Sequence, residues 1–113
     1  MSKSTLQLAI TVLTLITAAI HLGLVFVLSG TMQIMFILNG LGYLVLLYAL
    51  LRPPVFLQGR SSLVHYAFIA FASVTILGYF AVNGFKPDDT LGLIDKAVEI
   101  LLVAALFLHL GKK

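Results

Sequence analysis

Apolar residues dominate four stretches of this chain, and short polar segments separate them. The stretches cover residues 5–28, 32–51, 62–82 and 91–110. An α-helix needs about 20 predominantly apolar residues to cross the hydrocarbon core of a bilayer. The pattern therefore predicts four transmembrane helices. The first stretch is longer than the apolar part of a signal peptide, about 7–15 residues, so we expect it to be a retained span.

The connections between these stretches are short and contain helix-ending residues. Gly30 suits the left-handed position after a helix, and Thr31 suits the cap of the next one. Proline cannot continue the helical hydrogen-bond ladder, so Pro53 ends the second span. Further start and stop signals are Ser61, Ser62, Asn83, Gly84, Asp88, Asp89 and Thr90. We expect an all-α membrane protein: one domain, residues 1–113, folded as an antiparallel up-down-up-down bundle of four transmembrane helices.

Composition supports a membrane protein. Of 113 residues, 61% are hydrophobic and 10% are charged, and the mean hydropathy is +1.14. A soluble domain carries about 25% charged residues. The net charge of +3 is too small and too scattered to indicate nucleic acid, and the absence of cysteine excludes disulfides and thiolate metal sites. The expected surroundings are a lipid bilayer, in the inner membrane of a bacterial or archaeal cell.

Basic residues set the expected orientation. Cytoplasmic loops of membrane proteins carry an excess of Lys and Arg. One side of the predicted bundle holds Lys3, Arg52, Arg60, Lys112 and Lys113, and the other holds Lys86 together with Asp88 and Asp89. We therefore expect both termini in the cytoplasm.

The last stretch carries three charged residues near its start: Asp95, Lys96 and Glu99. Each apolar residue there favours insertion by about 0.3–0.6 kcal/mol, whereas one charged side chain at the helix centre costs about 2.5–3.5 kcal/mol. Insertion of this helix alone is marginal, so its carboxylates need partners, and Lys96 is expected to extend toward the interface. A helix lying on the membrane surface is the alternative, although residues 100–108 are apolar on all sides.

Polar residues of the other spans are predicted to supply these partners. About eight residues inward from its non-cytoplasmic end, each span reaches a depth of about 12 Å in the membrane. His21, Asn39, Thr75 and Glu99 fall at this level. Tyr79 and Asp95 lie one turn closer to the surface. We expect these six residues to form an intramembrane polar cluster in which Glu99 pairs with His21, with Asn39 nearby.

Two further patterns indicate inward-facing helix surfaces. The first span has a polar stripe at helical spacing, which consists of Gln7, Thr11, Thr14, Thr17 and His21. Small residues allow helices to approach closely. Such contacts are expected at Ala19 with Gly23 and at Gly40 with Gly42.

His65 and His109 are expected at similar depth in the cytoplasmic half, on the third and fourth spans. Two opposed histidines are what a bis-His haem requires, with ring nitrogens on iron. The pair is therefore a candidate tetrapyrrole site. His21, without a second histidine at its level, is a candidate ligand for the magnesium of a chlorophyll.

Three functional classes remain after the sequence is searched for catalytic motifs. It contains no HExxH, GxSxG or Walker pattern, so an enzyme is the least favoured class. The favoured class is a non-catalytic membrane module, either a homo-oligomer or an accessory subunit of a larger membrane complex. A proton- or cation-coupled transporter or channel using Glu99, Asp95 and His21 is the first alternative. A haem- or chlorophyll-binding subunit is the second.

Overall fold

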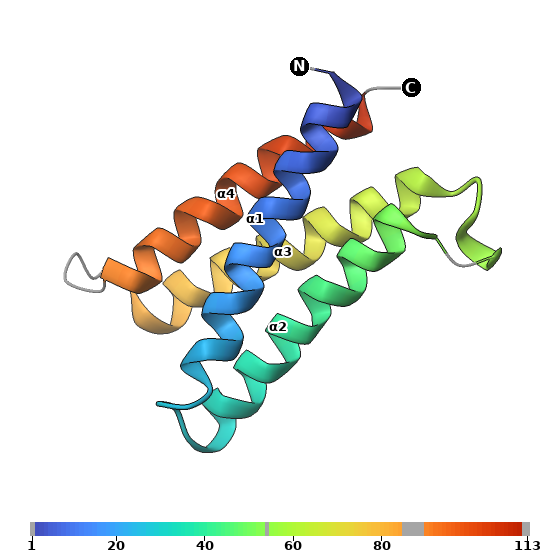
Figure 1. Ribbon diagram of the computed structural model, residues 1–113. Helices are drawn as coiled ribbons and strands as arrows, with labels where there is room; N and C mark the ends of the chain where they lie inside the picture. Colours follow the sequence, from blue (N-terminus) through green and yellow to red (C-terminus); the bar gives the residue numbers. More distant parts are fainter. Residues whose placement is uncertain (1, 54, 85–89, 112–113) are drawn as a thin grey trace.

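Four long α-helices form a bundle in the computed structural model, which describes residues 2–53, 55–84 and 90–111 (Figure 1). The helices are α1 (Lys3–Leu24), α2 (Gly30–Leu51), α3 (Ser61–Asn83) and α4 (Thr90–Leu110), and a short 3-10 helix, η1 (Val55–Leu57), lies between α2 and α3. Helices α1 and α3 each pack against both α2 and α4. The start of α1 and the end of α4 lie at the same end of the bundle (Figure 1). The predicted all-α four-helix bundle is confirmed.

Three of these helices are long and apolar enough to cross a membrane: α1, α2 and residues 62–82 of α3. These three candidate spans indicate a multi-pass membrane protein. Helix α4 has a similar length, 21 residues, but it carries Asp95, Lys96 and Glu99. Its length and composition alone therefore do not qualify it as a span, and the fourth span stays a prediction.

The bundle presents apolar side chains to its surroundings. Leu8, Val45 and Val74 are exposed by 65%, 66% and 70% on three different helices. In water such a surface would drive aggregation, whereas the hydrocarbon core of a bilayer matches it. The interior combines an apolar core, which includes Tyr43 and Phe68, with buried polar and charged side chains.

The helix ends differ from the prediction at the first turn. Helix α1 ends at Leu24 and not at residue 28, and a turn occupies residues 25–27. Gly30 has a positive φ, 64°, as predicted. It is, however, the first residue of α2 and not a residue that follows α1 directly. Ser29 therefore takes the N-cap position that was expected for Thr31. The polar side chain of Gln33 closes this connection by donating to the Val25 carbonyl oxygen at 3.0 Å.

Close helix contacts occur at one of the two predicted small-residue pairs. A Cβ atom on Gly40 would lie 2.6 Å from the Leu22 side chain, and one on Gly42 would lie 2.5 Å from Phe71. Both glycines therefore allow a neighbouring helix to approach, as predicted. The prediction for Ala19 and Gly23 is wrong within this chain, because both residues are exposed. A Cβ on Gly23 would meet no described atom within 4 Å.

Several predicted features lie outside the described residues. They are the loop 85–89 with its charges Lys86, Asp88 and Asp89, and the terminal residues Lys112 and Lys113. Of the predicted start and stop signals, Thr90 is the first residue of α4, and α3 begins at Ser61 and ends at Asn83. Gly84 follows α3 with a positive φ of 68°.

Candidate functional site

The three charged side chains of α4 are buried inside the bundle. Asp95 and Lys96 are each 4% exposed, and Glu99 is fully buried. Asp95 and Glu99 are four residues apart and therefore share one helix face. Through hydrogen bonds this face contacts α1 and α2. We refer to His21, Tyr43, Asp95, Lys96 and Glu99 together as the charged cluster.

Glu99 is bound from two directions. The Tyr43 hydroxyl donates to its Oε2 atom, and the Lys96 ammonium donates to its Oε1 atom. Tyr43 is fully buried on α2, and its ring packs against Phe68 and, edge-on, against Phe71, with ring centroids 6.2 and 4.9 Å away. The aromatic core of the bundle thus holds the hydroxyl that binds Glu99.

Asp95 connects α4 to α1. Its Oδ1 atom accepts a hydrogen bond from the Thr17 hydroxyl at 2.6 Å. Its Oδ2 atom lies 3.2 Å from the Lys96 ammonium nitrogen and 3.7 Å from His21 Nε2. Lys96 therefore bridges Asp95 and Glu99, and polar contacts run without interruption from α1 to α2.

The orientation of the His21 ring follows from its backbone contact. Its Nδ1 atom lies 2.8 Å from the Thr17 carbonyl oxygen. A carbonyl oxygen only accepts hydrogen bonds, so Nδ1 carries the proton. In a neutral ring, Nε2 then holds a lone pair, and its neighbour is the Asp95 carboxylate. Two electron-rich atoms face each other unless a positive charge lies on or between them.

The charge count of the cluster also requires an additional positive charge. Two carboxylates, Asp95 and Glu99, are matched by one ammonium, Lys96. A buried site with unbalanced charge is strongly destabilising. One additional positive charge, either a proton or a bound cation, makes the cluster neutral. The arrangement can therefore hold one further proton or cation.

The remaining predicted cluster residues lie on α2 and α3. The Thr75 hydroxyl is 3.2 Å from the Asn39 side-chain oxygen and 2.9 Å from the Phe71 carbonyl oxygen, and it donates to one of them at a time. The Lys96 ammonium lies over the Tyr79 ring, 5.2 Å from its centroid. Helix α3 thus contributes an aromatic face to the Lys96 ammonium.

Two expectations for the cluster need correction. The predicted ion pair of His21 with Glu99 is wrong, because the carboxylate beside His21 Nε2 is Asp95. Helix α1 ends one turn earlier than predicted, at Leu24. His21 therefore lies one turn nearer the end of the bundle at which α1 connects to α2, at the level of Asp95. Lys96 does not extend toward the interface but lies inside the cluster.

The polar stripe of α1 faces the protein, as predicted. Thr14, Thr17 and His21 are buried, and Gln7 and Thr11 are half-buried. The Thr11 hydroxyl donates back to the Gln7 carbonyl oxygen at 2.8 Å, whereas Thr17 donates across to α4. The same residue type thus satisfies its own helix at one level and binds a carboxylate at another.

Thr17, Tyr43 and Lys96 were not among the predicted site residues. Thr17 belongs to the polar stripe, and Tyr43 shares a helix face with Asn39, so both had a signal in the sequence. Lys96 was noted beside Asp95 and Glu99, but it was expected to extend toward the interface, as a lysine near a helix end does by default.

A second polar contact lies at the other end of α4. His65 and His109 face each other, as predicted, with ring centroids 4.9 Å apart, planes tilted by 20° and 2.6 Å between His65 Nε2 and His109 Nδ1. We refer to these two residues as the histidine pair. An iron between two ring nitrogens needs about 4 Å between them, since metal–nitrogen bonds are about 2.0 Å long. The pair as arranged here leaves no room for an iron between its rings.

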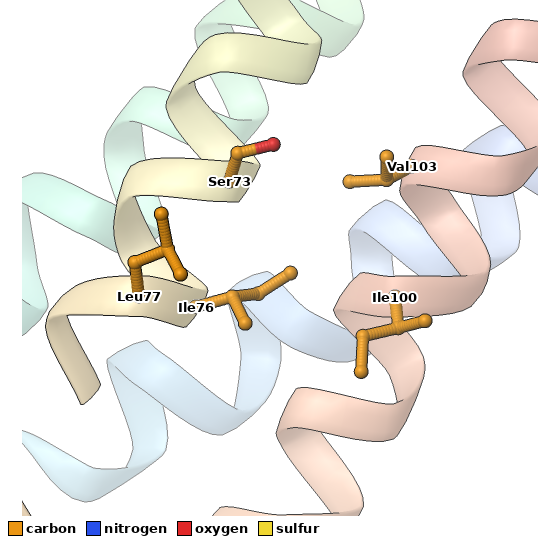
Figure 2. Close-up of a pocket in the computed structure, with 5 residues that line it drawn as sticks. All are labelled: Ser73, Ile76, Leu77, Ile100 and Val103. Carbon is orange, nitrogen blue, oxygen red and sulfur yellow. The ribbon is translucent and has the colours of Figure 1, made fainter. Parts of the chain in front are cut away.

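A crevice of about 270 Å³ opens between α3 and α4 on the surface of the bundle. In Figure 2, Ser73 and Ile76 point from α3 toward α4, and Val103 points back from α4. The lining of this crevice is almost entirely apolar and consists of Ser73, Ile76, Leu77, Ile100 and Val103. Such a lining suits hydrocarbon and carries no group for proton or metal chemistry, so the charged cluster is the candidate site.

Comparisons with family models, curated proteins and solved structures found no match to this chain.

Proposed function

We propose that this chain is a non-catalytic membrane module whose four helices all span the bilayer, with both termini in the cytoplasm. One observation carries the proposal: α4 contacts its partners near both of its ends. Asp95 binds Thr17 near its start, and His109 contacts His65 near its end. A helix held at both ends within an antiparallel bundle shares the membrane crossing of its neighbours. In this role the charged cluster fixes how α4 packs.

Cysteine labelling tests the fourth span, because the chain has no cysteine of its own. Single cysteines replace Ser2 and Gly111, which flank the first and last helices, and Ser29 in the first turn. With four spans, a membrane-impermeant maleimide labels Ser2→Cys and Gly111→Cys from the same side and Ser29→Cys from the other. Labelling of Gly111→Cys from the Ser29 side contradicts the proposal.

We propose that the module works in association with other helices, either in a homo-oligomer or as an accessory subunit. Ala19 and Gly23 support this, because they form an exposed small-residue pair on α1 and such pairs favour close helix association in lipid. Ala19→Cys should give crosslinked dimers in native membranes if the chain self-associates. Val45→Cys, at an exposed site on α2, is the matched control. Crosslinks to larger proteins instead would indicate the accessory role, and none above the control contradicts both.

A second function, proton- or cation-coupled transport, is favoured by one specific observation. His21, Asp95 and Glu99 are all buried and each places one ligand atom within 4.8 Å of the others'. The test is whether a proton gradient drives a cation flux in proteoliposomes. This flux should be lost in Glu99→Gln and retained in Glu99→Asp. An equal flux in the natural chain and Glu99→Gln removes this candidate.

A further inference from the structure

We propose that His21, Asp95 and Glu99 form a binding site for a divalent transition-metal ion of the Zn²⁺ type, and that the Lys96 ammonium occupies this site as an internal, displaceable cation. The inference deepens the second proposed function by naming the class of cation. It rests on the geometry of the charged cluster, and its test measures binding without any flux.

The ligand set fits such an ion. One imidazole nitrogen and two carboxylate oxygens suit Zn²⁺, Co²⁺ and related ions, whereas Mg²⁺ and Ca²⁺ prefer oxygen ligands alone. The three ligand atoms lie within 4.8 Å of one another. A tetrahedral ion with bonds of about 2.0–2.2 Å needs its ligands about 3.4 Å apart. The flexible ends of Asp95 and Glu99 can close this difference.

His21 already has the hydrogen-bonding arrangement of a metal ligand. Metal-binding histidines almost always donate their second ring N–H to a carboxylate, a carbonyl or water, which fixes the tautomer and the ring orientation. In this chain Nδ1 donates to the Thr17 carbonyl oxygen at 2.8 Å. The other nitrogen, Nε2, is thereby left with its lone pair beside the Asp95 carboxylate, 3.7 Å away. A cation between these two atoms would satisfy both.

Lys96 marks the position at which a cation is stable. Its ammonium lies 3.2 Å from Asp95 Oδ2 and binds Glu99 Oε1. These are two of the three proposed ligand residues. Tyr79 covers the ammonium from α3 with its ring at 5.2 Å. The protein has thus built a buried cation position whose occupant, in this structure, is part of the chain.

Charge balance describes the exchange. With His21, Asp95, Glu99 and Lys96 as its charged and titratable members beside Tyr43 and Tyr79, the cluster is neutral when it holds one proton besides Lys96. A divalent ion balances both carboxylates by itself. Its entry therefore releases the proton and moves the Lys96 ammonium out. Lys96 lies about 9 Å along α4 from Thr90, so its long side chain can reach the membrane interface.

The test is equilibrium binding of Co²⁺ to the purified full chain in detergent, followed by visible d–d absorption and by proton release into weak buffer. We expect the natural chain to bind Co²⁺ with release of about one proton per ion, and Zn²⁺ but not Mg²⁺ to compete. His21→Phe should weaken binding at least tenfold. His65→Phe is the matched control, and it should leave binding unchanged.

Lys96→Met tests the exchange itself. Because it removes the internal cation, it should bind Co²⁺ at least tenfold more tightly than the natural chain. Should this variant not fold, the comparison of the natural chain with His21→Phe and Glu99→Gln decides the ligand assignment. No binding by the natural chain at millimolar Co²⁺, binding that survives His21→Phe, or binding by Lys96→Met no tighter than by the natural chain would each overturn the proposal. Binding without flux would remove only the transport function.

Discussion

Two buried polar sites lie along α4, the charged cluster near its start and the histidine pair near its end. Both are almost fully buried, and both contain histidine. The cluster involves α1, α2 and α4 directly and is covered by Tyr79 of α3, whereas the contact between His65 and His109 joins α3 and α4. The difference follows from charge. A buried carboxylate or ammonium needs several partners, whereas a neutral imidazole is satisfied by one or two.

This comparison also separates the roles of the two sites. In the cluster each charged side chain is balanced by a neighbour of opposite charge, so removal of one leaves the charge of its neighbour unbalanced. In the histidine pair, loss of one ring removes a hydrogen bond between two imidazoles and no charged partner. Substitutions in the cluster should therefore cost more stability than equivalent substitutions in the pair, and their effects should depend on one another.

The largest effect is expected for Lys96→Met. It leaves Asp95 and Glu99 close together without their shared cation, and breaking a buried ion pair in this way costs about 3–5 kcal/mol. Unfolding of the detergent-solubilised protein by SDS, followed by circular dichroism, measures the loss. Arg60→Met, which removes an exposed cation, should change stability by about 0.5 kcal/mol or less. Equal losses in the two variants would mean that Lys96 balances no buried charge.

Tyr43→Phe should produce the next largest loss. It keeps the ring packed among Phe68 and Phe71 but removes the hydroxyl that donates to Glu99. Hydrogen bonds to charged groups contribute about 1.5–3 kcal/mol, and the same SDS titration should show a loss of this size. Tyr48→Phe is the matched control because Tyr48 is 63% exposed. A loss of stability no larger than that of Tyr48→Phe would mean that the Tyr43 hydroxyl does not bind a charged Glu99.

A double-mutant cycle tests which carboxylate pairs with His21. His21→Phe combined with Asp95→Asn should show a coupling of about 1 kcal/mol, within the range for residues in contact. The cycle of His21→Phe with Glu99→Gln should show a smaller coupling, because Glu99 binds mainly to Tyr43 and Lys96. Measured stabilities of the single and double variants give both values. The opposite order would restore the pairing that depth alone predicted.

The smallest effect is expected for His65→Phe in the histidine pair. The variant keeps an aromatic ring against His109 and removes the hydrogen bond between His65 Nε2 and His109 Nδ1, which is worth about 0.5–1.5 kcal/mol. Thermal unfolding in detergent resolves a change of this size when it is compared with Tyr43→Phe. A loss greater than that of Tyr43→Phe would show that the histidine pair, and not the charged cluster, is the stronger connection of α4.

Much of this arrangement could be predicted from the order of residues. Four apolar stretches predicted the four helices, and the polar stripe of α1 predicted which of its faces is buried. Counting from the helix ends placed Asn39 and Thr75 at one level, and their side chains are in contact. The partner of His21 could not be predicted in this way, because it depends on where α1 ends. The turn after Leu24 is formed by apolar residues, Val25 to Val27, which carry no stop signal.

Residue order thus determined which groups must be buried together: charges on an apolar helix have to find partners within the chain, because lipid offers none. Only the packing of the helices established which atoms meet. A shift of one turn exchanges Asp95 for Glu99 beside His21, and a rotation of the Lys96 side chain decides whether its ammonium meets water or two carboxylates. Neither changes the apolar pattern, so neither can be predicted from the sequence. Together they place the Lys96 ammonium beside the carboxylates of Asp95 and Glu99.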